Sequence, residues 1–133
     1  MIATIDEQQF YEDVIRRHCE EPYHNDSLPS ATHRQRIDNP VCGDSVQLEL
    51  QVSDTGIIEQ AWFTGTGCVI SQASASILVE HLEGQLLSTL RSFSAEDMLH
   101  LFRARLTPLR QRCCLLSWEA FRQISSNIND TCR

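Results

Sequence analysis

Between positions 46 and 64, apolar and polar residues alternate, and this pattern constrains the fold more than any other part of the chain. Every second residue from Val46 to Val52 is apolar, which is the period of a half-buried strand with one polar face. Asp54-Thr55-Gly56 is typical of a tight turn. The chain then returns over residues 57–64 as a second strand, whose expected inner face holds Ile57, Ala61 and Phe63. The pattern predicts an antiparallel hairpin.

The outer ends of this hairpin carry two short motifs that contain thiols. Cys42-Gly43-Asp44 stands just before the first strand, and Gly65-Thr66-Gly67-Cys68 follows the second. Since antiparallel pairing brings the outer ends of a hairpin together, we expect Cys42, Asp44 and Cys68 to be neighbours in space.

At residue 69 the hydrophobic period changes to that of a helix. This helix is predicted to run to residue 82, with Gly84 as its C′ residue. Its inner face is expected to hold Ile70, Ala73, Ile77, Leu78, His81 and Leu82. Cys68 would then lie at the helix N-terminus, where free amide N–H groups and the helix dipole favour an anion. We therefore expect its thiol to ionise readily.

A third thiol position, Cys113-Cys114, lies in the last predicted helix. Pro108 suits the first turn of that helix, and its inner face is expected to hold Leu109, Cys113, Leu116, Ala120 and Ile124. Consecutive helical residues point about 100° apart, so one ion is not expected to take both thiols. The polar tail from Asn127 to Arg133 is expected to fray, which makes Cys132 a poor ligand candidate.

The N-terminal third of the chain predicts one helix and one edge strand. Thr4-Ile5-Asp6-Glu7 fits a capping box that opens a helix ending near Glu20. Residues 23–38 are expected to form an ordered loop with a short edge strand around residues 32–37. Cys19 is interpreted as a packing or surface residue, and His24 and His33 as solvated loop residues.

Two further elements are predicted between the long helices. Residues 86–93 suit a short helical turn, and Ser94-Ala95-Glu96-Asp97 caps a helix with Met98 and Phe102 in the core. Together the elements predict one α+β domain over residues 1–133, in which helices pack against a small antiparallel sheet of about three strands. No internal repeat or linker interrupts it.

Charge and cysteine content narrow the classes of function. The net charge of −7 argues against nucleic acid or an anionic membrane as partner, because both need basic surface. No apolar run approaches the roughly 20 residues that span a bilayer, and residues 1–13 lack the pattern of a signal peptide. A cytoplasmic location is predicted, where the six cysteines are ligands, reactive thiols or buried residues rather than disulfides. A local basic patch is either a surface for an acidic partner or a solvated face: Arg103, Arg105, Arg110 and Arg112.

Three thiolates and one carboxylate make a tetrahedral ligand set for zinc, and thiolates also suit iron–sulfur clusters. The ligands come from distant elements, unlike the local knuckles of a zinc finger, which favours a working site. The residues alone leave three interpretations. They are a protein that handles a metal or cluster, a structural zinc in a binding module, and a cysteine hydrolase, although no nucleophilic triad spacing supports the last.

Several linked motifs resemble one known family, the U-type iron–sulfur scaffold proteins, which include IscU, SufU and the N-terminal domain of NifU. The likeness covers roughly residues 8–126. The matching motifs, in chain order, are Phe10-Tyr11-x-x-Val14-Ile15, Asn39-Pro40-x-Cys42-Gly43-Asp44, Phe63-x-Gly65-x-Gly67-Cys68, Ser71-x-Ala73-Ser74-Ala75-Ser76 and Arg110-x-x-Cys113-x-x-Leu116-x-Trp118.

The resemblance implies a small antiparallel sheet with packed helices, and a ligand set of Cys42, Asp44, Cys68 and Cys113, with Cys114 matching a usual alanine. It implies sulfur received as a persulfide on Cys42, Cys68 or Cys113 from a cysteine desulfurase. Some family members build a [2Fe–2S] cluster from iron and sulfur, for transfer to apo iron–sulfur proteins. Others hold Zn²⁺ and act as zinc-dependent sulfur acceptors.

The sequence falls between the subgroups of this family. Arg112 stands where the IscU group has histidine; arginine does not ligate metal, but its charge would stabilise a neighbouring thiolate or persulfide. The long insertion usual in the SufU group is absent between the second and third cysteines. Residues 106–110 resemble only loosely the segment by which the IscU group engages its chaperone, which weighs against chaperone docking.

Overall fold

The computed structural model describes residues 12–41, 43–103 and 105–131. Residues 12–20 are helical, and the helix stops before Pro22 as predicted. Its predicted start at residues 4–7 lies outside the described residues. The elements that follow are β1 (His33–Asn39), β2 (Asp44–Val52), β3 (Ile58–Thr66), α2 (Val69–Leu82), the 3₁₀ helix η1 (Leu87–Ser92), α3 (Ala95–Phe102), α4 (Pro108–Cys114) and α5 (Leu116–Thr131). None of the described helices has the length and apolar character that a membrane span requires.

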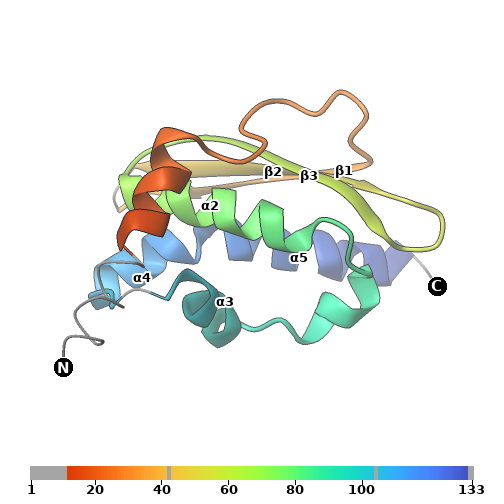
Figure 1. The fold of residues 1–133 in the computed structure, drawn as a ribbon. Coiled ribbons are helices and arrows are strands. Elements are labelled where there is room, and N and C mark those ends of the chain that lie inside the picture. Colours follow the sequence, from red (N-terminus) through yellow and green to blue (C-terminus); the bar gives the residue numbers. More distant parts are fainter. Residues whose placement is uncertain (1–11, 42, 104, 132–133) are drawn as a thin grey trace.

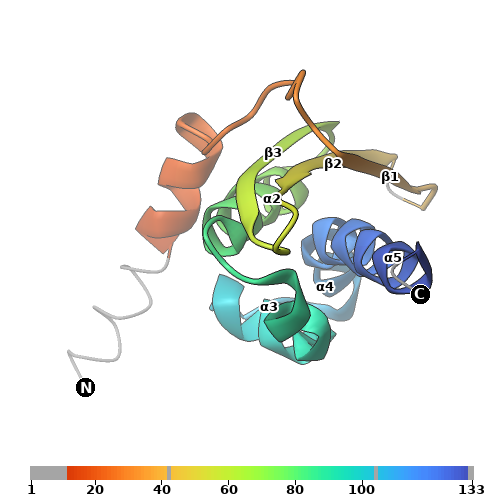
Figure 2. The ribbon, with the colours of Figure 1, turned by 90° about the vertical axis from the view of Figure 1, so that its right-hand side faces the viewer.

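The three strands form one antiparallel sheet in the order β1-β2-β3. Helices α2 and α5 cover one face of this sheet, with α3 and η1 on the far side of the helices (Figures 1 and 2). The α+β architecture predicted from the sequence is therefore confirmed, including the edge strand, which runs from His33 to Asn39. Buried residues of all three layers form one hydrophobic core.

A register shift in the hairpin overturns one predicted core residue. Gln51 pairs with Gln60, but the next residue, Val52, pairs with Ile58. The extra residue in β3 forms a bulge, which reverses the faces of everything beyond it. As a result Ile58 is fully buried and Ile57 is 39% exposed, whereas simple alternation places Ile57 inside. Ala61 and Phe63 lie on the other side of the bulge from Ile57, and both are buried as expected.

The outer face of β2 is less exposed than its polar pattern suggests, because Glu49 is buried there. The loop between the first helix and β1 crosses this face, and its Leu28 N–H donates a 2.8 Å hydrogen bond to Glu49 Oε1. Gln47 Nε2 donates to the other carboxylate oxygen at 2.9 Å. A buried carboxylate needs such donors, so Glu49 fixes the loop over the sheet.

The open edge of β3 is closed by the loop and by the end of α2. Phe63 N–H donates to His24 C=O at 3.0 Å, and Ala61 N–H donates to Glu83 Oε2 at 2.9 Å. The same Glu83 carboxylate accepts from Tyr23 Oη at 2.5 Å and lies 2.8 Å from His24 Nδ1. The His24 ring is also stacked between Tyr23 and Trp62. These contacts fix the ring, so His24 is not the solvated loop residue predicted.

Helix α2 spans the residues predicted for it, and Gly84 adopts a positive φ of 86° just past its C-cap. The helix is buried on more sides than a surface helix, because the sheet, α3, α4 and α5 all pack on it. Its small residues Ser71, Ala73, Ser74, Ala75 and Ser76 are buried. Ser76 Oγ bonds to His18 Nδ1 at 2.7 Å, which ties the first helix to α2. Small side chains permit this close packing on every face.

Helix α3 begins with the predicted capping box of Ser94 and Asp97, and Met98 and Phe102 are buried. The single last helix expected from the sequence is in fact two, α4 and α5, separated at Leu115. No glycine or proline marks this break. Leu109, expected to face the core with Cys113, is 53% exposed. The backbone of α5 stays helical to Thr131, beyond the predicted onset of fraying at Asn127, and Cys132 lies outside the described residues.

Candidate metal and sulfur site

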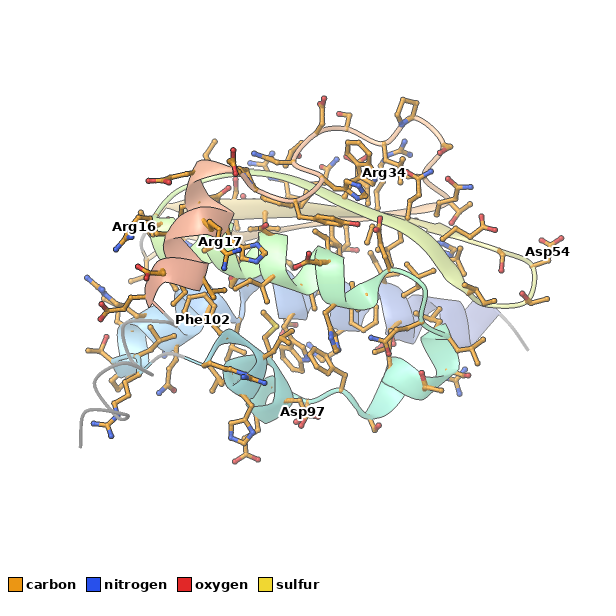
Figure 3. The ribbon with its side chains drawn as sticks, viewed as in Figure 1. Arg16, Arg17, Arg34, Asp54, Asp97 and Phe102 are labelled. Carbon is orange, nitrogen blue, oxygen red and sulfur yellow. The ribbon has the colours of Figure 1, made fainter. Side chains whose placement is uncertain are left out.

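Three segments that are distant in sequence end at one side of the molecule, opposite the β2–β3 turn. They are the start of β2, the start of α2 and helix α4 (Figure 1). The turn itself carries Asp54, which projects at the far end from Arg16 (Figure 3). Pairing of Ser45 with Thr66 sets the start of β2 beside the end of β3. The hairpin thus delivers Asp44 and Cys68 to one place, as its geometry predicts.

Asp44 is the centre of this site. It is only 2% exposed, and its Oδ1 accepts a 3.0 Å hydrogen bond from the Cys68 backbone N–H. Its Oδ2 accepts from the Cys68 thiol at 3.1 Å. A carboxylate in this position can bind the same metal ion as the thiol. The carboxylate and the thiol therefore act as one unit.

Cys68 caps the N-terminus of α2, as predicted. Its backbone is extended (φ −76°, ψ 165°) and its Sγ accepts from Ser71 N–H at 3.5 Å. This is the position in which a side chain satisfies one of the free N–H groups of the first helical turn. The Cys68 sulfur thereby contacts both the Ser71 N–H in the first turn of α2 and the Asp44 carboxylate.

Gly67 makes room for the carboxylate. Its φ is +135°, and a Cβ built on it would lie 2.5 Å from Asp44 Cγ and 2.8 Å from Asp44 Cβ. Any larger residue would both adopt an unfavourable backbone conformation and collide with Asp44. The glycine in the Gly65-Thr66-Gly67-Cys68 motif is therefore a condition for the contact between Asp44 and Cys68.

Helix α4 brings the third group, Cys113, which is 4% exposed. The helix is opened by Pro108 in its first turn and by Thr107, whose Oγ1 accepts from Arg110 N–H at 3.3 Å. One carboxylate oxygen of Asp44 and the sulfurs of Cys68 and Cys113 all lie within 4.8 Å of one another. Within the described part of the chain, this is the one group of three or more such side chains.

A pocket of about 660 Å³ contains the three groups. It is lined by Asp44, Gly67, Cys68, Val69, Ile70, Leu109, Arg110 and Cys113. Leu109 is therefore exposed because it forms a wall of this pocket. Sequence reasoning does not single out Leu109 or Arg110 as part of the site. Their spacing from Cys113, four and three residues before it on a helix, is the available signal, since such residues share a face.

The other cysteines and the predicted stabiliser are not among these three groups. Cys42, expected beside Asp44, is outside them. Cys114 is fully buried in the core, and burial raises the pKa of its thiol to about 12. Cys19 donates to Val69 C=O at 3.4 Å, and burial together with the neighbouring Cys68 raises the pKa of the Cys19 thiol. Arg112 lines a different pocket, with Asn39, Pro40 and Trp118, so its role toward a thiolate stays a prediction.

The donor set fits zinc in both chemistry and spacing. Ligand atoms around a tetrahedral zinc lie roughly 3.5–3.8 Å apart, given bonds of about 2.0–2.3 Å. Atoms already within 4.8 Å of one another need to move inward by about 1 Å to reach that spacing. Two thiols and a carboxylate lack one ligand of a tetrahedral site, and Cys42, two residues from Asp44, is the candidate for it.

Comparison with known proteins agrees with this geometry. A family model described as the NifU-like N terminal domain matches residues 10–129. The chain belongs to this family. The resemblance inferred from the thiol motifs is thus confirmed.

Relatives of both subgroups are found. The iron–sulfur cluster assembly scaffold protein IscU of Thermotoga maritima is 28% identical over 92% of this chain and 96% of its own length. The zinc-dependent sulfurtransferase SufU of Bacillus subtilis is 32% identical over 83% of this chain and 85% of its own. The crystal structure of the N-terminal part of a NifU-like protein from Brucella abortus shares the fold, with a TM-score of 0.73 at 18% identity over 95% of this chain and 97% of that one.

Proposed function

We propose that this protein is an iron–sulfur cluster assembly scaffold that accepts sulfur from a cysteine desulfurase at the Asp44–Cys68–Cys113 site. The observation that carries the proposal is the approach of one carboxylate oxygen and two thiols to within 4.8 Å of one another, in a pocket that solvent enters. In the proposal Cys42 completes the set, and the metal or [2Fe–2S] cluster is cargo. Apo iron–sulfur proteins would receive a completed cluster.

Sulfur uptake follows ordinary thiol–disulfide chemistry. A thiolate of the site attacks the outer sulfur of a persulfide on the donor, and a new S–S bond forms as the donor's S–S bond breaks. The donor cysteine leaves as a thiolate with the bonding electrons, so the step needs no external oxidant. Cys68 is partly exposed, whereas Cys113 is 4% exposed. We therefore assign the first attack to Cys68 in preference to Cys113.

The carboxylate supports this step in the proposed mechanism. Asp44 Oδ2 accepts a 3.1 Å hydrogen bond from the Cys68 thiol, so it can take the thiol proton as the thiolate forms. Bound Zn²⁺ or iron would supply the same effect, since a coordinated thiol loses its proton. As a hard oxygen ligand among thiolates, Asp44 is also the ligand that leaves most easily to expose a coordination position.

A second candidate is a zinc-dependent sulfurtransferase that accepts a persulfide without building a cluster. Two observations favour it. The Bacillus subtilis relative carries that name at 32% identity, and Arg112 stands beside Cys113 where a ligating histidine would add a further nitrogen donor for iron. In this interpretation zinc protects the thiols, and the same residues carry the sulfur.

One anaerobic experiment separates the two. The protein is incubated with a cysteine desulfurase, cysteine and ferrous iron, and metal content, visible absorption and the mass of each cysteine-containing peptide are measured. A [2Fe–2S] chromophore supports the scaffold. A persulfide mass shift on Cys42, Cys68 or Cys113 without a chromophore supports the sulfurtransferase. Cys68→Ser should abolish both signals and Cys113→Ser should abolish the chromophore, while Cys19→Ser and Cys114→Ala serve as matched thiol controls that keep them.

The proposed function fails if neither sulfur nor cluster is acquired by the wild-type protein. It also fails if the Cys68→Ser and Cys113→Ser variants behave as wild type. We further propose that residues 1–133 act as one domain, since the described elements share a single core.

A further inference from the structure

Charge is distributed very unevenly along this acidic chain. Residues 98–118 contain four arginines and no aspartate or glutamate, while the rest of the chain carries seven arginines against eighteen acidic residues. All eleven basic residues are arginine, and lysine is absent. Arginine offers a planar fork that matches a carboxylate with two hydrogen bonds. The segment from Met98 to Trp118 is thus a local basic region in an otherwise strongly acidic protein.

Three arginines of this segment differ from many of the others in their exposure and charge partners. Arg16, Arg34, Arg36 and Arg122 form salt bridges with Asp13, Glu49, Asp38 and Glu119. Arg105, Arg110 and Arg112 are exposed, and none of the salt bridges within the described residues involves them. Neighbouring guanidinium groups repel one another, and a partner that brings carboxylates would relieve that repulsion.

Two of these arginines lie on α4 within three residues of Cys113, and Arg105 lies three residues before that helix. Arg110 lines the thiol pocket, and Arg112 lines a second pocket with Asn39 and Pro40. Of the five large apolar side chains that are exposed among the described residues, three lie around the site in sequence or in the pocket wall: Val41 at 67%, Val69 at 60% and Leu109 at 53%. We call Val41, Val69, Leu109, Arg105, Arg110 and Arg112 the site face.

We propose that the site face docks an acidic protein surface, whose carboxylates pair with Arg105, Arg110 and Arg112 while an apolar loop enters the thiol pocket. The inference rests on the proposed function, because it describes the partner that delivers sulfur to that pocket. Exposed apolar groups with arginine around them are the composition of a protein interface. An extended polyanion such as RNA fits less well, because the remaining surface is acidic and repels it beyond the patch.

Charge complementarity of this kind acts mainly on the rate of association. Steering by opposite charges raises association rate constants by about 10–10³-fold, and salt removes most of the gain. At about 0.1 M salt the Debye length is about 10 Å, so charges across the face still act together; at about 1 M it is about 3 Å and they do not.

The test measures association of the full-length protein with two probes, a cysteine desulfurase and a synthetic peptide in which glutamates flank an apolar centre. A peptide with lysines in place of the glutamates and a single-stranded RNA are the controls. Biolayer interferometry at low and high salt is run on wild type, Arg105→Glu/Arg112→Glu and Arg105→Lys/Arg112→Lys. The matched control for total charge is Arg16→Glu/Arg91→Glu.

We expect the Arg105→Glu/Arg112→Glu variant to lose at least tenfold in association rate constant at low salt, with the difference vanishing at high salt. The Arg105→Lys/Arg112→Lys variant should retain most of the association rate constant, and the Arg16→Glu/Arg91→Glu control should retain all of it. Equal rates for wild type and the charge-reversed variant would overturn the inference, as would equal binding of the lysine peptide or the RNA. Wild type that binds the acidic peptide through these arginines but acquires no sulfur from any desulfurase would overturn the proposed function and support the docking surface.

Discussion

Replacing Gly67 by alanine tests how the site is built. The glycine has φ +135°, and a Cβ there would lie 2.5 Å from Asp44 Cγ. The backbone conformation costs about 1–3 kcal/mol for a residue with a side chain, and the collision adds about 1–3 kcal/mol of overpacking. The alanine also pushes the carboxylate away from the Cys68 thiol. We therefore expect the free energy of unfolding to fall by about 2–6 kcal/mol and zinc affinity to fall at least about tenfold.

Gly56→Ala is the matched control. Gly56 also has a positive φ, +89°, but nothing lies within 4 Å of a Cβ built on it. Alanine at this position should lose only the backbone term, about 1–2 kcal/mol, and should leave zinc affinity unchanged. Urea unfolding gives the stability, and competition with a chromophoric chelator gives the zinc affinity.

A double variant tests whether the collision with Asp44 contributes to the stability loss in Gly67→Ala. In the Gly67→Ala/Asp44→Ala double variant the Oδ1 and Cγ atoms that the new Cβ would strike are gone. The two stability losses should therefore be less than additive. The reasoning is refuted if Gly67→Ala binds zinc as tightly as Gly56→Ala does, or if the two losses at Gly67 and Asp44 add fully.

Three other expectations follow from the described contacts. Cys113→Ala should lose zinc while Cys114→Ala keeps it and loses about 1–2 kcal/mol of stability through its buried cavity; loss of zinc in Cys114→Ala alone would reverse the ligand assignment. The hydrogen bond to Glu83 raises the pKa of Tyr23 to about 12, so its contribution to stability is full below pH about 10 and is lost as pH rises through about 12. Ultraviolet titration should show one late tyrosine that Tyr23→Phe removes, and an unchanged titration would contradict this. Ser94→Ala removes the capping box of α3 and should destabilise the protein by about 1 kcal/mol in urea, with zinc affinity as the control readout; an unchanged midpoint would refute the capping argument.

Local patterns predict those elements whose ends are marked by local chemistry. Helix α2 is bounded correctly because Cys68 and Gly84 mark its two ends, and α3 because Ser94 and Asp97 form a reciprocal cap. The bulge beside Val52 escapes prediction, since alternation alone does not reveal an inserted residue. The break at Leu115 carries no glycine or proline and is equally hidden.

The sequence predicts those parts of the site that consecutive, paired strands bring together. Antiparallel pairing of the hairpin is enough to place Asp44 beside Cys68, whatever packs on the sheet. The choice of Cys113 over Cys114 comes from the family resemblance, and burial of Cys114 in the core supplies a physical reason for it. Burial of Glu49 and exposure of Leu109 do not follow from the sequence pattern, because both depend on a loop or pocket formed by distant segments.

The most direct test of the central claim is the coordination of zinc in the loaded protein, measured by X-ray absorption together with zinc stoichiometry. We predict one zinc per chain, bound by the three sulfurs of Cys42, Cys68 and Cys113 and one oxygen of Asp44. Cys68→Ser and Cys113→Ser should each remove one sulfur from that shell or abolish binding, and Cys114→Ala should change nothing. A zinc shell that keeps its sulfurs in both serine variants, or a protein that binds no zinc, would contradict the account.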